Sequence, residues 1–92
     1  MVTMPAKVTP EGKLFGETLK RLREDRHLSQ EKLANSSRLG SKPMTTNFVS
    51  DLERGLKVPS LTTILKLAHA MGCEPSELLS GFTSAKMKNF FR

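Results

Sequence analysis

Helical spacing of apolar residues is the feature that most constrains the fold of this chain. From Lys13 onward, Phe15, Leu19 and Leu22 recur at intervals of four and three residues, with charged residues between them. This spacing predicts an amphipathic helix that ends near His27. The segments that follow show the same kind of pattern between short turn signals, so the sequence predicts an all-α fold.

Capping and turn residues divide the rest of the chain into further helices. Ser29 is a good N-cap for a second helix that opens at Gln30. The stretch 35–43 is rich in turn-forming residues. Thr45 is expected to cap a third helix, which ends at Gly55.

Two more helices are expected after Gly55. Ser60 opens a fourth helix, which Gly72 ends, and Glu74 with Pro75 opens a short fifth helix, which Gly81 ends. The inner face of the fourth helix is predicted to consist of Leu61, Ile64, Leu65, Ala68 and Met71.

With 92 residues, the chain has room for one domain. We expect residues 1–12 to form a flexible N-terminal arm, residues 13–81 the folded domain, and residues 82–92 a basic and apolar tail. The apolar residues of that tail are Phe82, Met87, Phe90 and Phe91. Two interpretations of the tail stay open: a contact with a second copy or a partner, and a disordered segment in which only Phe82 covers the core.

Composition excludes several classes of site. The net charge of +6 favours a polyanionic partner. The single cysteine, Cys73, excludes a disulfide within the chain and a cysteine-based zinc cluster, and we expect it to be a small buried apolar residue. His27 and His69 are far apart, so we expect no metal site. We also expect no cofactor and no enzyme activity, because no phosphate-binding glycine loop or nucleophile motif is present.

Residues 1–9 lack the apolar core of a signal peptide and no run reaches the length of a membrane span, so we expect a cytoplasmic protein.

Three segments in order resemble the Cro/CI-type (XRE-type) helix-turn-helix family of phage repressors and bacterial regulators. They are L-S-Q-E-K-L-A at 28–34, L-E-R-G at 52–55 and P-S-L-T-T-I-L-K-L-A-H-A-M-G at 59–72. The resemblance covers roughly residues 14–81 and implies a five-helix, lambda-repressor-like domain. It also implies that residues 46–53 are the recognition helix, which enters the DNA major groove.

The resemblance implies a sequence-specific double-stranded DNA-binding transcriptional regulator, with repressor as the leading role. It would act as a homodimer on a two-fold symmetric operator, because a single helix-turn-helix reads too few bases to find a genomic site. Alternatives are an antitoxin with a toxin partner, the controller of a restriction system, and a protein-interaction module that has lost DNA binding.

The family's DNA-contacting positions can be carried over residue by residue. The base-reading positions fall on Thr46, Asn47, Ser50 and Asp51. Asn pairs well with adenine, whereas Asp accepts only from cytosine and is repelled by phosphates, so Asp51 is alternatively expected to hold a neighbouring side chain. The expected phosphate contacts are Gln30, Arg38, Lys42, Thr45, Lys57 and Ser60. Gln30 is also implied to brace the recognition helix.

Further family positions concern structure and assembly. Arg23 and Glu53 match a partly buried ion pair that joins the first helix to the end of the recognition helix. The implied dimer interface consists of Leu78, Leu79 and Phe82.

The chain departs from the family pattern before the recognition helix. The stretch 35–43 is longer than the family's usual turn, and either extends the second helix or forms a loop that brings Arg38 and Lys42 to the DNA backbone. Phe48 stands where the family usually has a small polar residue. It contacts a thymine methyl group or packs beneath the enlarged loop, and we favour packing.

Overall fold

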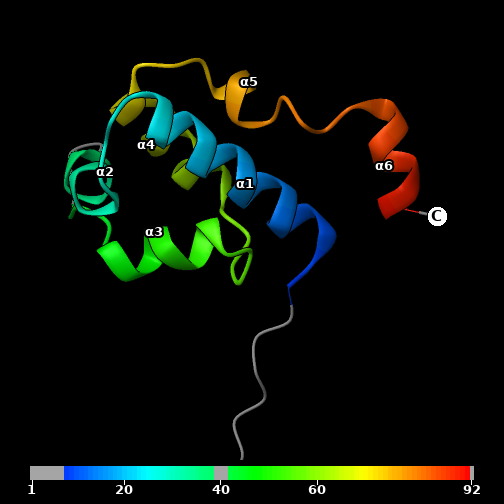
Figure 1. The fold of residues 1–92 in the computed structure, drawn as a ribbon, viewed down its shortest axis with the longest axis horizontal. Coiled ribbons are helices and arrows are strands. Elements are labelled where there is room, and N and C mark those ends of the chain that lie inside the picture. Colours follow the sequence, from blue (N-terminus) through cyan, green and yellow to red (C-terminus); the bar gives the residue numbers. More distant parts are fainter. Residues whose placement is uncertain (1–7, 39–41, 92) are drawn as a thin grey trace, which may run out of the picture.

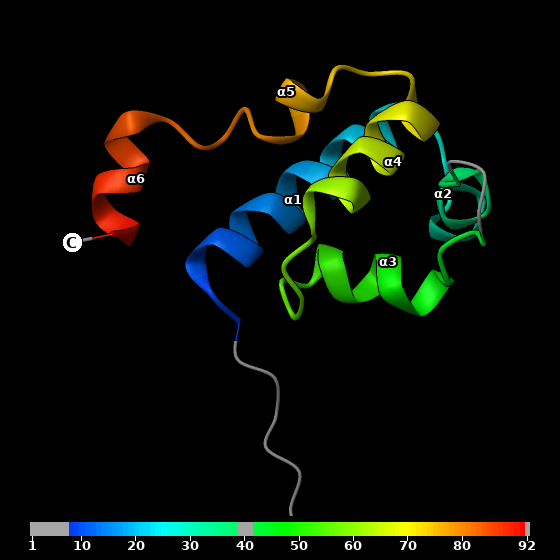
Figure 2. The same cartoon turned by 180° about the vertical axis from the view of Figure 1, so that it is seen from behind.

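The computed structural model describes residues 8–38 and 42–91, and in that part of the chain the secondary structure is helical, with no strand. The all-α architecture predicted from the sequence is confirmed. The helices are α1 (Pro10–Asp25), α2 (Gln30–Ser36), α3 (Thr46–Glu53), α4 (Leu61–Met71), α5 (Pro75–Leu78) and α6 (Ser84–Phe90). Helices α1 to α5 form one body, and α6 stands apart from it in both views (Figures 1 and 2).

Helix α1 begins earlier than the apolar period predicts. The Thr9 side chain accepts a hydrogen bond from the Gly12 backbone N–H at 3.1 Å, and Pro10 occupies the first turn, where its missing N–H costs nothing. Residues 10–12 therefore belong to α1, and the expectation that they are part of an arm is wrong. Residues 8 and 9 of the expected arm precede the helix, and residues 1–7 lie outside the described residues.

The next three helices begin where their capping residues predict. Each N-cap side chain accepts a hydrogen bond from the third helical N–H: Ser29 from Lys32 at 3.0 Å, Thr45 from Phe48 at 3.1 Å, and Ser60 from Thr63 at 3.1 Å. These bonds satisfy N–H groups that have no partner within the helix.

Helix α5 ends at Leu78 rather than near Gly81. The Leu79 and Ser80 N–H groups bond to carbonyls three residues back, which turns the chain out of the α-helix. Gly81 has a different role, because a Cβ there would lie 3.0 Å from the Leu14 side chain. The missing side chain at position 81 lets the segment after α5 pass close to α1.

The core lies between helices α1 to α5. Five leucines are fully buried in it: Leu19, Leu33, Leu52, Leu67 and Leu78. Because each of these helices contributes one of them, the core fixes the helices relative to one another, including α3.

The inner face of α4 differs from the prediction. Leu61 is 70% exposed and Leu65 is 41% exposed, whereas Leu67 is fully buried. The buried stripe runs through Leu67, Ala68 and Met71, with Ile64 at its edge. Leu61 lies in the first turn beyond the end of this stripe and Leu65 lies on its flank, so both face solvent.

Two glycines let the backbones of α1 and α3 come very close. A Cβ at Gly16 would overlap the Leu52 carbonyl oxygen and lie 2.6 Å from the Glu53 oxygen. Gly55 ends α3 with φ of 77°, a conformation that favours glycine. A Cβ at Gly55 would also lie 3.0 Å from the backbone of Lys13. The end of α3 is therefore fixed directly against α1.

The tail forms a helix that the sequence did not predict. Thr83 caps α6 by accepting a hydrogen bond from the Lys86 N–H at 3.2 Å. The Phe82 and Phe90 rings meet edge to face with centroids 6.2 Å apart. Phe82 also packs against the core, whereas Phe91 is 69% exposed. Phe82 thus joins the body to α6.

Candidate nucleic-acid interface

Helix α3 lies along one edge of the body (Figure 1), and its exposed and half-buried polar side chains form one polar face. Thr46 and Asn47 are exposed and Ser50 and Asp51 are half-buried, whereas Val49 and Leu52 are buried on the opposite side. Residues four apart lie on one face of a helix, so these polar residues form two adjacent rows. All four expected base-reading positions therefore share one accessible face.

The Asn47 side-chain amide lies at the beginning of this polar face. The Thr45 oxygen is used as the N-cap, accepting from the Phe48 N–H. Within the described part of the chain, no hydrogen bond engages the Asn47 side chain. Its donor and acceptor are therefore available to a ligand.

The end of α3 is held by a buried network around Glu53. Arg23 donates from Nε to Glu53 Oε2 at 2.5 Å and from Nη2 to Oε1 at 3.0 Å. The exposed fractions of these two side chains are 11% and 3%. Arg23 also donates from Nη1 to the Leu28 carbonyl at 2.7 Å. The hydrogen bond with Glu53 raises the pKa of Arg23 above its ordinary value, so the ion pair stays charged.

Gln30 extends this network to the start of α2. Its Nε2 donates to Glu53 Oε1 at 2.9 Å. One carboxylate therefore connects α1, α2 and α3, and the Gln30 side chain lies against the end of the helix that it was expected to brace.

A second charged cluster surrounds Asp51. Its Oδ1 accepts a hydrogen bond from Arg54 Nη2 at 2.7 Å, and its Oδ2 lies 3.6 Å from Lys57 Nζ. Lys57 Nζ also lies 5.3 Å from the centroid of the Phe48 ring, a cation–π distance. Phe48 is half-buried and packs against the core. The sequence reasoning missed Arg54, although it is the arginine of the L-E-R-G motif and follows α3 directly.

The segment between α2 and α3 is partly helical. Helix α2 continues to Ser36, and the Ser37 hydroxyl donates to the Leu33 carbonyl at 2.6 Å. Arg38 and Lys42 are both exposed. Residues 39–41, between these two, lie outside the described residues. The expected phosphate contact Ser60 caps α4, and its hydroxyl also contacts Thr63 Oγ1 at 3.1 Å.

A helix-turn-helix family model matches residues 19–78, from within α1 to the end of α5. The control protein C.BamHI of Bacillus amyloliquefaciens is 37% identical over 67 residues, which are 72% of this chain and 76% of that protein. The chain belongs to the XRE-type helix-turn-helix family. It is therefore a DNA-binding transcriptional regulator.

Solved structures show the same relationship. The restriction-modification controller protein C.AhdI from Aeromonas hydrophila is 43% identical, with a TM-score of 0.66, over 74% of this chain and 96% of that one. The clp gene regulator ClgR from Corynebacterium glutamicum is 25% identical, with a TM-score of 0.70, over 82% and 74%. These relatives are described as controllers or regulators and not as enzymes.

The helix-turn-helix body also carries exposed apolar residues outside α3. We define the α4–α5 patch as the exposed apolar residues Val58, Leu61, Leu65 and Leu79. A hollow of about 100 Å³ beside it is lined by Val58, Leu79 and Phe82, among others. Leu78, expected at a dimer interface, is fully buried in the core of its own chain, so it has no surface to offer a second copy. That expectation is corrected, while Leu79 and Phe82 remain accessible.

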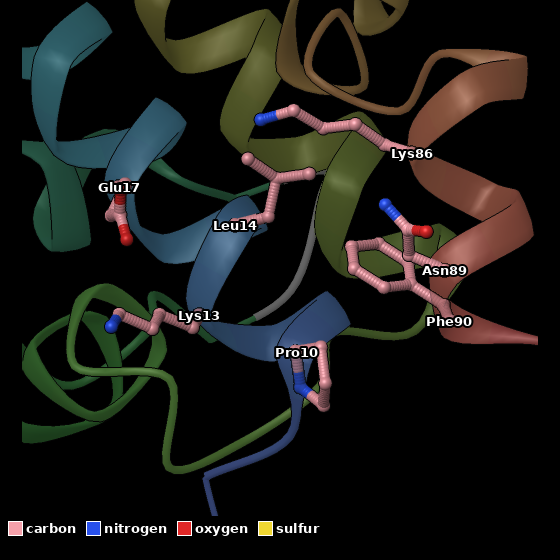
Figure 3. Close-up of a pocket in the computed structure, with 7 residues that line it drawn as sticks. All are labelled: Pro10, Lys13, Leu14, Glu17, Lys86, Asn89 and Phe90. Atoms are coloured by element: carbon pink, nitrogen blue, oxygen red, sulfur yellow. The ribbon is translucent and has the colours of Figure 1, made fainter.

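An open pocket of about 390 Å³ lies between α1 and α6 (Figure 3). Lys13, Leu14 and Glu17 come from α1, and Lys86, Asn89 and Phe90 come from α6. In Figure 3 the Lys13 amine points away from α6 and the Glu17 carboxylate also lies off to the side, so these polar groups do not converge on one point.

The described residues also bear on metal binding, membrane insertion and thiol reactivity. Among residues 8–38 and 42–91, no group of three side chains is placed to hold a metal ion. No helix in the same ranges has both the length and the apolar character needed to cross a membrane. Cys73 is half-buried, and burial raises the pKa of its thiol, which disfavours the reactive thiolate.

Proposed function

We propose that this regulator is a sequence-specific repressor that binds double-stranded DNA as a homodimer at a two-fold symmetric operator. The observation that supports this most is the difference between the two ends of α3. The C-terminal end of α3 is fixed by the Glu53 network, while Asn47 at the beginning of α3 is exposed and makes no side-chain hydrogen bond with residues 8–38 or 42–91. A rigid helix with free polar side chains is suited to reading base edges in the major groove.

Base readout is assigned to Thr46, Asn47 and Ser50, and backbone contacts to residues around the recognition helix. Lys57 lies just after α3, and Arg38 and Lys42 are exposed in the segment before it. Gln30, Thr45 and Ser60 supply polar groups at helix starts. The net charge of +6 supports a phosphate contribution to binding, which makes affinity fall with salt.

The α4–α5 patch is proposed as the surface on which a second copy packs. Leu61 is 70% exposed and Val58 is 61% exposed, and neither is needed in the core of one chain. A contiguous exposed apolar surface often marks an interaction site. Packing the patches of two copies against each other gives the two-fold symmetry that a palindromic operator requires.

The relatives favour one biological role among those considered. C.BamHI and C.AhdI, found by separate comparisons, are named as a control protein and a restriction-modification controller. We therefore propose that this chain controls a restriction-modification system from the cytoplasm, and we prefer this role to that of an antitoxin with a toxin partner. It acts by occupying its operator, without enzyme activity or a cofactor.

Selection of bound duplexes from a random DNA pool tests the proposal. We expect the pool to converge on two inverted half-sites, with centres about 10 base pairs or a multiple apart. The selected sequence is then located in the genome. A restriction or methyltransferase gene adjacent to that genomic match would support the controller role. Recovery of duplexes without any shared sequence would contradict sequence-specific binding.

A substitution in the patch tests the dimer. Leu65→Lys places a charge in the α4–α5 patch and is expected to shift sedimentation from dimer to monomer, because burying an unpaired charge is costly. Glu24→Gln, on the exposed face of α1, raises the net charge by the same amount and is the control. If both variants sediment like the parent, the patch is not the interface.

A further inference from the structure

Both oxygens of the Asp51 carboxylate face cations of the same chain. Oδ1 accepts from Arg54 Nη2 at 2.7 Å, and Oδ2 lies 3.6 Å from Lys57 Nζ. A cytosine amino group would have to compete with these cations for an oxygen. Phosphates around the groove would also repel the carboxylate. This geometry disfavours base readout by Asp51.

We infer that Asp51 is a positioning residue, which holds Arg54 and Lys57 beside the end of α3 for contact with backbone phosphates of double-stranded DNA. The inference rests on the proposed function. It replaces the expected base-reading role of Asp51, and it adds Arg54 to the DNA-contacting residues.

The side chains of Arg54 and Lys57 are mostly exposed, which explains why another residue is needed to order them. The Arg54 side chain is 62% exposed and that of Lys57 is 53% exposed, whereas that of Asp51 is only 24% exposed. Long exposed cationic side chains lose conformational entropy when they bind a ligand, and ordering them beforehand lowers this cost. Asp51, fixed on the helix, provides that order.

The cluster keeps the capacity to bind phosphate. The contact with Asp51 uses one terminal nitrogen of Arg54, and a guanidinium has other N–H donors. Lys57 has a second fixed neighbour, because its Nζ lies 5.3 Å from the centroid of the half-buried Phe48 ring. Two cations against one carboxylate leave the cluster with positive charge.

The position of the cluster assigns it to the DNA backbone. Arg54 caps the C-terminal end of α3 and Lys57 lies in the turn that follows, so both cations stand at the opposite end of the helix from Thr46 and Asn47. Phosphate contacts fix the register of a protein on the duplex, and base contacts inside the groove depend on that register. Loss of Asp51 is therefore expected to weaken operator binding more than binding to unrelated DNA.

The test compares Asp51→Asn with Asp25→Asn, which removes one exposed carboxylate at the far end of α1. Affinity is measured for the selected operator and for an unrelated duplex of equal length. We expect Asp51→Asn to reduce the ratio of the two affinities by about two- to tenfold relative to Asp25→Asn. The preferred base at each position should not change. Asp51→Glu, which keeps a carboxylate, should retain most of the parent selectivity.

Asp51→Asn is also made in a protein that already carries Arg54→Ala and Lys57→Ala. This triple variant tests whether Asp51 acts through these two cations. If Asp51 acts through these two cations, Asp51→Asn should have no further effect on selectivity there. An undiminished loss in that background would overturn the inference. A change of preference from cytosine to adenine at one base pair would also overturn it, because asparagine reads adenine.

Failure of the inference and failure of the proposed function give different results. In one result, the parent prefers its operator while neither Asp51→Asn nor Asp25→Asn changes the ratio of operator affinity to unrelated-duplex affinity. That result would overturn only the role of Asp51. A parent without selectivity would overturn the proposed function, and the inference with it. Thermal unfolding of each variant confirms that the affinities belong to folded protein.

Discussion

Asn47 is proposed as the main base-reading residue of α3. It is exposed at the second position of α3, and its amide is unengaged within the described residues. Asn47→Ala is expected to cost roughly 1–3 kcal/mol on the selected operator and to relax selection at one base pair in each half-site. Quantitative binding to operators changed one base pair at a time measures both effects.

The control for Asn47 lies on another helix. Asn89→Ala removes an exposed amide from α6 and should leave operator preference unchanged. Binding of the Asn47→Ala variant to unrelated DNA should also stay near that of the parent, because no phosphate contact is lost. A folded Asn47→Ala protein with the parent's preference would shift base readout to Thr46 and Ser50.

Cys73 gives a prediction about pH. Burial raises the pKa of its thiol in the folded state. The folded state therefore holds this proton more tightly than the unfolded state. The contribution of the protonated Cys73 thiol to the free energy of unfolding is complete at pH values below the thiol pKa of the unfolded state. It is lost as pH rises through the thiol pKa of the folded state. Denaturant titrations across the alkaline range should show a steeper loss of stability for the parent than for Cys73→Ala.

Thiol reactivity checks the same point independently. At one mildly alkaline pH, alkylation of Cys73 by iodoacetamide should be slower in the folded protein than in urea, because only the thiolate reacts. Equal rates in the two states would show that the folded environment does not protect the thiol.

At the scale of the elements, the contact between α1 and α3 depends on Gly16. Gly16→Ala adds a Cβ that overlaps the Leu52 carbonyl. Alanine in a helix interior gains about 1 kcal/mol over glycine, but overpacking costs about 1–3 kcal/mol, and a backbone carbonyl cannot turn aside as a side chain can. We therefore expect net destabilisation of Gly16→Ala, measured by urea unfolding.

Gly81→Ala is the matched comparison. The three atoms nearest to its added Cβ all belong to the Leu14 side chain, the nearest at 3.0 Å, and a leucine side chain can adjust. This variant should lose less stability than Gly16→Ala. The reverse order would show that α1 and α3 separate easily.

Local signals predicted the middle elements well. The capping residues Ser29, Thr45 and Ser60 set their helix starts correctly, because a side chain that satisfies an orphan N–H acts over three residues and needs no tertiary information. The start of α1 was missed because the apolar period begins at Lys13, whereas the helix is set by Thr9 and Pro10.

Tertiary features were harder to predict from the sequence. Periodicity predicted that Leu61 and Leu65 lie in the core, because it indicates an approximate inner face of α4. It does not show where the core ends, which decides Leu61, or how wide the buried stripe is, which decides Leu65. Arg54 is a different case, because it stands three residues after Asp51, a local spacing that brings two helical side chains together. Leu78 was assigned to an interface by resemblance, but burial within its own chain depends on how α5 packs.

At the scale of the whole molecule, the end of the chain is expected to influence assembly. Phe82 borders the hollow beside the α4–α5 patch and contacts Phe90 of α6. A chain ending at Ser80 loses both, so its dimer should dissociate at higher concentration than the full chain. Sedimentation over a concentration series measures this. An unchanged dissociation constant would remove Phe82 and α6 from the interface.

The unequal ends of α3 have a consequence for how such a protein diversifies. Near its end, Glu53 is tied to two other helices, and Gly16 allows the backbones to touch. At its beginning, Thr46 and Asn47 follow a surface segment and have no part in the core. Mutations at these two positions can therefore accumulate at little cost in stability. A duplicated gene could acquire a new DNA target by changing the first turn of α3 while its fold and its mode of pairing are inherited unchanged.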